Sequence, residues 1–340
     1  MEISPFIQGL PKVELHLHIE GTLEPDLKHE LAQRNGIKVE DSSAQSGNAS
    51  YDIDDLVSFL AVYYDGMNVL QKAEDFYDLA MAYFRKVADQ NLRYAEIFFD
   101  PQAHTSRGVP FHSVITGLRR AQIEAEQKLG ITSGLIMCFL REFQEEYAMA
   151  TLLEALPYRA WILGIGLDSD ENGNPPAKFE RVYARAKAEG FMLTAHCDVD
   201  IPNSIEHIRQ AIEQIGVARI DHGTNIVEDP RLLDYIVKNN IGLTTCPISN
   251  KWVSDGSKVE LIKELHNCGV KITINSDDPA YFGGYIAENF QVLADEGNAS
   301  NEFLGQCSLN AVDISWAPTT LKVQLREEIE QYMKNDGASV

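Results

Sequence analysis

The sequence has few positive charges for its size. It holds 29 Lys and Arg residues against 51 Asp and Glu residues in 340, which gives a formal net charge of -22 at pH 7. A surface of this sign repels phosphate backbones and anionic lipid headgroups. We therefore expect no nucleic-acid and no membrane partner, and a small neutral or cationic molecule is favoured as the substrate.

Paired cysteines and long apolar runs are also missing. The five cysteines include no C-x-x-C pair, so a disulfide framework is not expected and a reducing compartment is favoured. No run approaches the roughly 18 apolar residues that would indicate a membrane span, and the N-terminus lacks the basic and apolar regions of a secretory signal. The expected location is the cytoplasm. The oligomeric state is left open, a homo-oligomer included.

A repeated alternation of two segment types runs along the chain. Short β-rich apolar runs occur eight times, and amphipathic segments of helical spacing follow most of them. The runs cover residues 13–19, 93–100, 132–140, 161–168, 191–198, 219–225, 242–248 and 271–278. This pattern predicts a single α/β domain over residues 1–340, a (β/α)8 TIM barrel. An open doubly wound sheet is the alternative, but EGTLEPDL after the first run is not its usual G-x-G-x-x-G motif.

The segment between the first two predicted strands, residues 20–92, is unusually long. It contains the polar stretch DSSAQSGNAS at 41–50, which predicts a flexible loop, and an aromatic-rich stretch at 52–70 that predicts a helix. In a barrel, an insertion here lies over the C-terminal mouth. We therefore expect residues 41–92 to form a lid or pocket wall, with ordinary packing as the alternative. The sequence beyond residue 280 predicts extra C-terminal helices.

Histidines and aspartates occur late in several of the predicted strands. His16 and His18 are two residues apart in VELHLHI, so they share one face of the first strand. The others come late in predicted strands five, six and eight: His196, His222, Asp277 and Asp278. The C-terminal strand ends form the catalytic face of a barrel. Burying these groups together is costly unless a cation compensates them.

A single metal ion would satisfy this arrangement. The predicted ligands are His16, His18, His196 and Asp277, which suit Zn²⁺, although Fe²⁺ or Mn²⁺ would accept the same set. The metal would lower the pKa of a bound water. His222 would then orient that water and accept its proton, while Asp278 would position the substrate. A barrel whose histidines are only structural is the alternative.

The sequence resembles the adenosine/adenine deaminase branch of the amidohydrolase superfamily. The resemblance rests on HLHIEGTLEP at 16–25, YAEIFFDPQ at 94–102, CFLREFQEE at 138–146, ILGIGLDSDENGNPP at 162–176, RIDHGTNIVEDP at 219–230, TTCPISN at 244–250 and INSDDPAYF at 274–282. It implies a barrel with one zinc that removes the purine 6-amino group as ammonia. It also implies the same four metal ligands, with His222 holding and deprotonating the water.

The resemblance further implies how the substrate is recognised. Asp278 would accept a hydrogen bond at the purine N7 side, and the backbone N–H of Ser169 would face N3. Glu20 stands where nucleoside-specific members carry an aspartate that contacts the sugar, which favours the free base, converted from adenine to hypoxanthine and ammonia. The alternatives are that Glu20 only braces its neighbours, and that the substrate is adenosine or an N6-substituted adenine.

One position departs from the family pattern. Family members end strand five with H-A-G-E, whose glutamate protonates the purine ring, whereas this chain has valine at the glutamate position, Val199. Valine cannot move a proton. We expect Asp198 or Asp200 to supply the acid, with Glu20 as an alternative donor. A slow purine-binding homologue or a non-catalytic ligand sensor is the remaining interpretation, because losing a general acid lowers a rate by ~10²–10⁴.

Overall fold

Parallel strands form the centre of the molecule. The computed structural model describes residues 1–38, 56–197, 201, 203–254 and 256–337. Within them the strands form two hydrogen-bonded sheets, in the orders β1-β2-β3-β4-β5 and β6-β7-β8-β9. The strands are β1 (Lys12–His18), β2 (Leu92–Phe99), β3 (Thr132–Leu140), β4 (Ile162–Asp168), β5 (Met192–Leu193), β6 (His196–Cys197), β7 (Arg219–His222), β8 (Gly242–Thr245) and β9 (Ile272–Ile274).

The two sheets join at both edges. β5 and β6 are one barrel strand interrupted by two residues, and the N–H of Thr194 in that gap still donates to the carbonyl of Ile165 on β4. At the other edge a parallel bridge pairs Leu17 with Asp277. There His18 N–H donates to the Asp277 carbonyl over 2.9 Å. The nine described strands therefore close into a barrel of eight, which confirms the predicted (β/α)8 fold.

Alternation along β1 shows how the barrel is filled. Val13, Leu15 and Leu17 belong to the apolar core. Glu14 and His16, on the opposite face of the strand, are fully buried among polar partners. Because alternate side chains of a barrel strand point inward, the polar side chains of β1 collect on the axis and the apolar ones pack against the surrounding helices.

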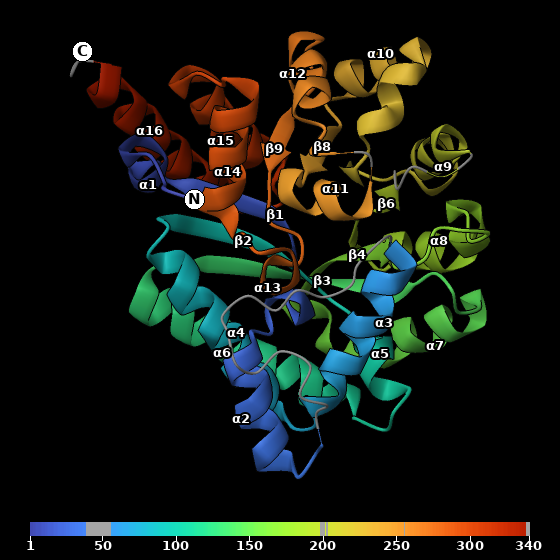
Figure 1. Cartoon of the computed structure of the whole chain (residues 1–340). Coiled ribbons are helices and arrows are strands. Elements are labelled where there is room, and N and C mark those ends of the chain that lie inside the picture. The colour runs from blue at the N-terminus through green and yellow to red at the C-terminus, as the bar shows by residue number, and fades with distance from the viewer. Residues whose placement is uncertain (39–55, 198–200, 202, 255, 338–340) are drawn as a thin grey trace.

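Helices surround the strands (Figure 1). Those that follow β2 to β8 are α5 (Pro101–Thr105), α6 (Phe111–Leu129), α7 (Glu145–Ala155), η3 (Leu156–Trp161), η4 (Pro176–Phe179), α8 (Glu180–Ala188), α9 (Ser204–Gln210), η5 (Ala211–Ile215), η6 (Thr224–Glu228), α10 (Pro230–Asn239), α11 (Pro247–Val253) and α12 (Val259–Asn267). Local sequence sets their ends: Asp229 caps α10 by accepting from the N–H groups of Arg231 and Leu232, and Asn240 ends it in a left-handed conformation.

The remaining helices lie before β1, in the long insertion and at the C-terminus. α1 (Pro5–Gly9) precedes β1, and α13 (Pro279–Phe282), α14 (Ile286–Gly297), α15 (Asn301–Ile314) and α16 (Thr319–Gly337) are the predicted C-terminal helices. The insertion contains η1 (Glu20–Thr22), α2 (Pro25–Asn35), α3 (Leu56–Gly66), η2 (Met67–Val69) and α4 (Ala73–Ala88). The loop predicted at 41–50 lies outside the described residues. No described helix is long and apolar enough to cross a bilayer.

Candidate active site

Four side chains from barrel strands one, five and eight converge at the carboxyl ends of the strands. His196 Nε2 lies 3.0 Å from His16 Nε2 and 3.0 Å from His18 Nε2. Asp277 Oδ1 lies 3.2 Å from His16 Nε2 and 3.4 Å from His18 Nε2. All four residues are buried, and their ligand atoms lie within 4.8 Å of one another. The structure thus brings together the four residues predicted as metal ligands.

The tautomer of His16 follows from its neighbours. The Thr244 hydroxyl donates its one proton to Asp221 Oδ1 over 2.9 Å. His16 Nδ1 lies 2.9 Å from the same hydroxyl oxygen, so His16 must donate there and its Nε2 carries the lone pair. A lone pair that faces other ligand atoms so closely is positioned to bind a cation shared among them. Three imidazole nitrogens and a carboxylate oxygen suit Zn²⁺, so the residues present fit a single divalent ion.

Burial and the contact between His16 and Asp277 together set the charges of this cluster. It lowers the pKa of His18 to about 3 and the pKa of His196 well below its usual value. Burial also opposes the charged form of His16, but Asp277 raises the pKa of that imidazole. In turn, and against the effect of burial, His16 holds the pKa of Asp277 well below its usual range. Neutral imidazoles and an ionised carboxylate are the forms that bind metals.

His222 lies beside the cluster at the end of β7. Its Nε2 is 3.7 Å from Asp277 Oδ2, and its ring centroid is 4.7 Å from that of His16. Burial, followed by the charge of His16, lowers its pKa, so the imidazole is a free proton acceptor at neutral pH. His222 and Asp277 both have positive φ angles, 61° and 62°, a strained conformation that the surrounding structure must impose.

A cavity of about 60 Å³ opens directly onto the cluster. Residues of α3 form one of its walls. The lining residues are His18, Leu56, Phe59, Leu60, Tyr63, Tyr64, Asp100, Asp168, Ser169, Glu171, His196, His222, Ser249, Val253, Asp277, Asp278 and Phe282. Within the described part of the insertion, α3 therefore contributes to the cavity lining.

Two predicted substrate-binding residues line this cavity. Asp278 is buried, and its Oδ1 has no hydrogen-bond partner among the described residues. A Cβ atom on Gly21 would lie 2.0 Å from that oxygen, so only glycine allows η1 to approach Asp278 this closely. Ser169 has a φ of 74°, and its hydroxyl lies 2.7 Å from the Tyr64 hydroxyl.

The other predicted residues lie elsewhere. Glu20 is buried behind the wall and is not among the lining residues. Its Oε1 accepts the backbone N–H of Asp100 over 3.1 Å and lies 2.8 Å from His104 Nε2, so it braces the start of α5. Asp198 and Asp200, the predicted proton donors, lie outside the described residues.

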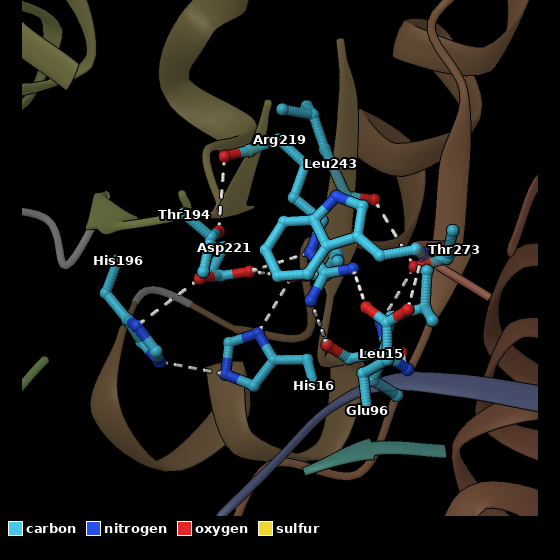
Figure 2. Close-up of polar contacts among 12 residues, drawn as sticks. Leu15, His16, Glu96, Thr194, His196, Arg219, Asp221, Leu243 and Thr273 are labelled. Carbon is cyan, nitrogen blue, oxygen red and sulfur yellow. Dashed lines mark hydrogen bonds and ion pairs between the residues drawn. The ribbon is translucent and has the colours of Figure 1, made fainter. Parts of the chain in front are cut away.

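Several polar residues of the site were not identified from the sequence. Asp100 and Asp168 follow apolar runs at the ends of β2 and β4, a signal that could have found them. Arg141 donates from Nη1 to the His196 carbonyl over 2.8 Å and so fixes strand five. Figure 2 shows a further buried network beside His16 and His196, in which Asp221 is the central carboxylate.

Comparison with known proteins gives consistent results over nearly the whole chain. The family model described as adenosine deaminase matches residues 11–332. An adenine deaminase of Vibrio parahaemolyticus is 47% identical over 97% of this chain and 98% of its own. The crystal structure of adenine deaminase from Arthrobacter aurescens superposes with a TM-score of 0.90 at 40% identity, covering 96% of this chain and 99% of that one.

A third similar protein carries a metal. An amidohydrolase from Burkhoderia ambifaria, solved with bound Zn, has a TM-score of 0.89 at 28% identity and covers 99% of this chain and 96% of its own. Matches to the family model and to full-length relatives agree with the barrel fold. The chain therefore belongs to the adenosine deaminase family.

Proposed function

We propose that this protein is a zinc-dependent hydrolase that converts adenine and water into hypoxanthine and ammonia. The observation that carries the proposal is the convergence of His16, His18, His196 and Asp277 on one point of the cavity wall, with His222 beside them. The substrate is inferred from relatives named adenine deaminase, among them the Vibrio parahaemolyticus protein.

The roles of the residues follow from their positions. A divalent cation held by the four ligands would supply Lewis acidity, which activates water for attack on carbon. His222, neutral and 3.7 Å from Asp277, would hold that water and take its proton as the oxygen attacks C6. The same imidazole, once protonated, is placed to pass the proton on to the departing amine.

The cavity residues would orient the ring. Asp278, with one carboxylate oxygen unpartnered, would face the N7 side, and the backbone of Ser169 would face N3. Glu20 lies outside the cavity lining and would not contact the ring. It would instead position Asp100, whose backbone N–H it accepts. α3 would exclude water from the bound base through its aromatic side chains.

Attack at C6 also requires a proton at ring nitrogen N1. Val199 replaces the glutamate that serves this purpose in the family. We assign the role to Asp198 or Asp200, which follow His196 within four residues. An acid at this position needs a raised pKa, and removal from water on substrate binding would provide it.

We assign zinc as the metal, one ion per chain, with Fe²⁺ and Mn²⁺ as alternatives that the same ligands accept. The donor set supports zinc, as does the metal in the Burkhoderia ambifaria protein. All five cysteines lie in the described residues and are free thiols. This state agrees with a cytoplasmic location, which we propose as well.

A substrate panel tests the proposal. Metal-loaded protein should release ammonia from adenine and form hypoxanthine, with lower kcat/KM on adenosine and on N6-methyladenine. A preference for N6-methyladenine would transfer the assignment to N6-substituted bases. If no panel member turns over at full metal occupancy, while hypoxanthine still binds, the protein is a ligand sensor and the deaminase proposal fails.

A further inference from the structure

The carboxyl group of Asp168 is a buried acceptor on the cavity wall with an oxygen left unused. Asp168 ends β4, is 3% exposed and lines the cavity. Its Oδ2 lies 3.4 Å from His18 Nδ1. Neither carboxylate oxygen has a hydrogen-bond partner among the described residues. Oδ2 faces the imidazole of His18, so Oδ1 is the oxygen available for a donor that enters with the ligand.

The position of Asp168 shows which part of a ligand it meets. His18 turns Nε2 toward the metal-ligand cluster and Nδ1 toward Asp168, so Asp168 lies one imidazole ring away from the cluster. A purine whose C6 sits at the cluster presents its far edge, N3 and N9, on the side away from it. Ser169, the next residue along the chain, lines the same part of the wall.

The chemistry around Asp168 selects a donor. Asp100 lies beside it, buried to 2% exposure, with its Oδ1 also lacking a hydrogen-bond partner among the described residues. Two carboxylates in one corner disfavour a phosphate or a second acceptor. A free purine base carries one azole hydrogen. In the tautomer that carries it on N9, the base donates here and N7 is an acceptor, so Asp278 at the N7 side would meet it with a protonated carboxyl group. A nucleoside carries a carbon on N9 and has no hydrogen to donate there.

We propose that Asp168 is a specificity-determining residue, which accepts the azole N–H of a free purine base and thereby excludes N9-substituted purines such as nucleosides and nucleotides. The inference rests on the proposed function, since it places C6 at the metal cluster. A site built around a substrate N–H rejects the analogue that lacks it by ~10⁴–10⁵, because the buried acceptor is left unpaired. Shape alone gives far weaker rejection of one added methyl group.

9-Methyladenine is the probe that isolates this contact, because it differs from adenine only by replacing the N–H with N–CH₃. In the wild type we expect kcat/KM on 9-methyladenine to be at least about 10³-fold below that on adenine. Asp168→Ala removes the acceptor and makes room for the methyl group. The preference, which is kcat/KM on adenine divided by kcat/KM on 9-methyladenine, should therefore fall by at least tenfold; this quotient is the ratio used below. Asp168→Asn keeps the volume and loses the charge, and should lower the ratio by less.

The control is Asp170→Asn, in the same loop. Asp170 is partly exposed, does not line the cavity and accepts from Asn172, so this variant should keep the wild-type ratio. Equilibrium binding of hypoxanthine and 9-methylhypoxanthine to the metal-loaded wild type gives a second readout that requires neither turnover nor a variant. We expect the methylated product to bind at least 100-fold more weakly.

Three results would overturn the inference. In the first, the wild type turns over adenine and 9-methyladenine, and binds hypoxanthine and 9-methylhypoxanthine, with values that differ by less than tenfold. In the second, Asp168→Ala turns over adenine with the wild-type ratio of kcat/KM values. In the third, metal analysis finds a second ion that occupies Asp100 and Asp168. Failure of the proposed function looks different: adenine is then not deaminated at all, while the two hypoxanthines still report on the contact by binding.

Discussion

Asp221 accepts a hydrogen bond from Thr244 over 2.9 Å, and through that hydroxyl it fixes the imidazole of His16. The second oxygen of the same carboxylate accepts from Thr194 over 2.6 Å and lies 3.7 Å from His196 Nδ1. Figure 2 shows Asp221 between the two imidazoles. One carboxylate therefore orients His16 through the Thr244 hydroxyl and lies near a second ligand, which a different barrel strand contributes.

Asp221 is itself held by a buried ion-pair network. Arg219 Nε lies 3.8 Å from Asp221 Oδ1, and Arg219 pairs through Nη1 with Glu96 on β2. The guanidinium also stacks on the Trp316 ring, 4.1 Å from its centroid. Arg219, Glu96 and Asp221 are all fully buried. This chain of contacts fixes the ligands before a metal binds, at the cost of burying three charges.

We predict that Asp221→Asn weakens Zn²⁺ binding by about 10- to 100-fold, the effect usual for such supporting contacts. The variant keeps the side-chain volume but loses the charge opposite Arg219 and one acceptor. Competition with a chromophoric chelator measures the affinity without reference to activity. Asp234→Asn, on the exposed face of α10, is the matched control. Equal Zn²⁺ affinities of the two variants would refute the role of Asp221 in supporting the metal ligands.

His222→Asn should lower kcat/KM on adenine by ~10²–10⁴, the usual contribution of a general acid or base. Asparagine tolerates the positive φ of 61° at this position, so the backbone is expected to keep its path. Zinc content and hypoxanthine affinity should stay near wild-type values. Loss of the metal along with activity would instead make His222 a ligand.

The proton donor is tested by changing the two aspartates after His196 one at a time. We expect Asp198→Asn or Asp200→Asn, but not both, to lower kcat by ~10²–10⁴ and to remove the alkaline limb of the pH–rate profile. The unaffected variant serves as the control for the other. Full rates in both variants would refute the assignment to this segment. Glu20, the other candidate from the sequence, lies outside the cavity lining.

Lys12 predicts a pH dependence of stability away from the site. Its ammonium group is fully buried and donates to the carbonyls of Ile7, Leu10 and Gln90, yet burial lowers its pKa to about 7. Because an unfolded lysine keeps a pKa of about 10.4, the unfolded chain binds more protons between pH 7 and 10. This group therefore makes the protein more stable as the pH rises, by up to ~1.4 kcal/mol per pH unit.

Lys12→Met removes this dependence. We compare the unfolding free energies of metal-loaded wild type and variant by urea unfolding at pH 7 and at pH 9. From pH 7 to pH 9, the unfolding free energy of the wild type should rise by about 2 kcal/mol relative to that of the variant. A difference that stays constant with pH would show that the buried amine keeps its charge in the folded state.

The fold was predictable because each strand of the barrel is a short, nearly continuous apolar run. The strand ends were predicted less well. The run at 219–225 ends as a strand at His222, because Gly223 adopts a φ of 76° and starts η6. The run at 271–278 ends as a strand at Ile274, although the backbone of Asp277 still pairs with β1.

The metal-ligand cluster was predictable from period-two alternation and from strand-end positions. The supporting residues were not. Asp221 and Asp168 lie on barrel strands like many other polar residues. Only the closed barrel shows that Asp221 lies near two metal-ligand imidazoles, while Asp168 lines the cavity. The position of Glu20 depends on Asp100 and His104, about 80 residues away, a contact that no local pattern encodes.

Titration of the metal-free protein with Zn²⁺ tests the central claim most directly. Chelator-treated protein should deaminate adenine at less than a hundredth of the loaded rate, and activity should rise linearly to one equivalent of Zn²⁺ per chain and then stop. Full adenine turnover before any metal is added, or a break at two equivalents, would contradict a single ion held by His16, His18, His196 and Asp277.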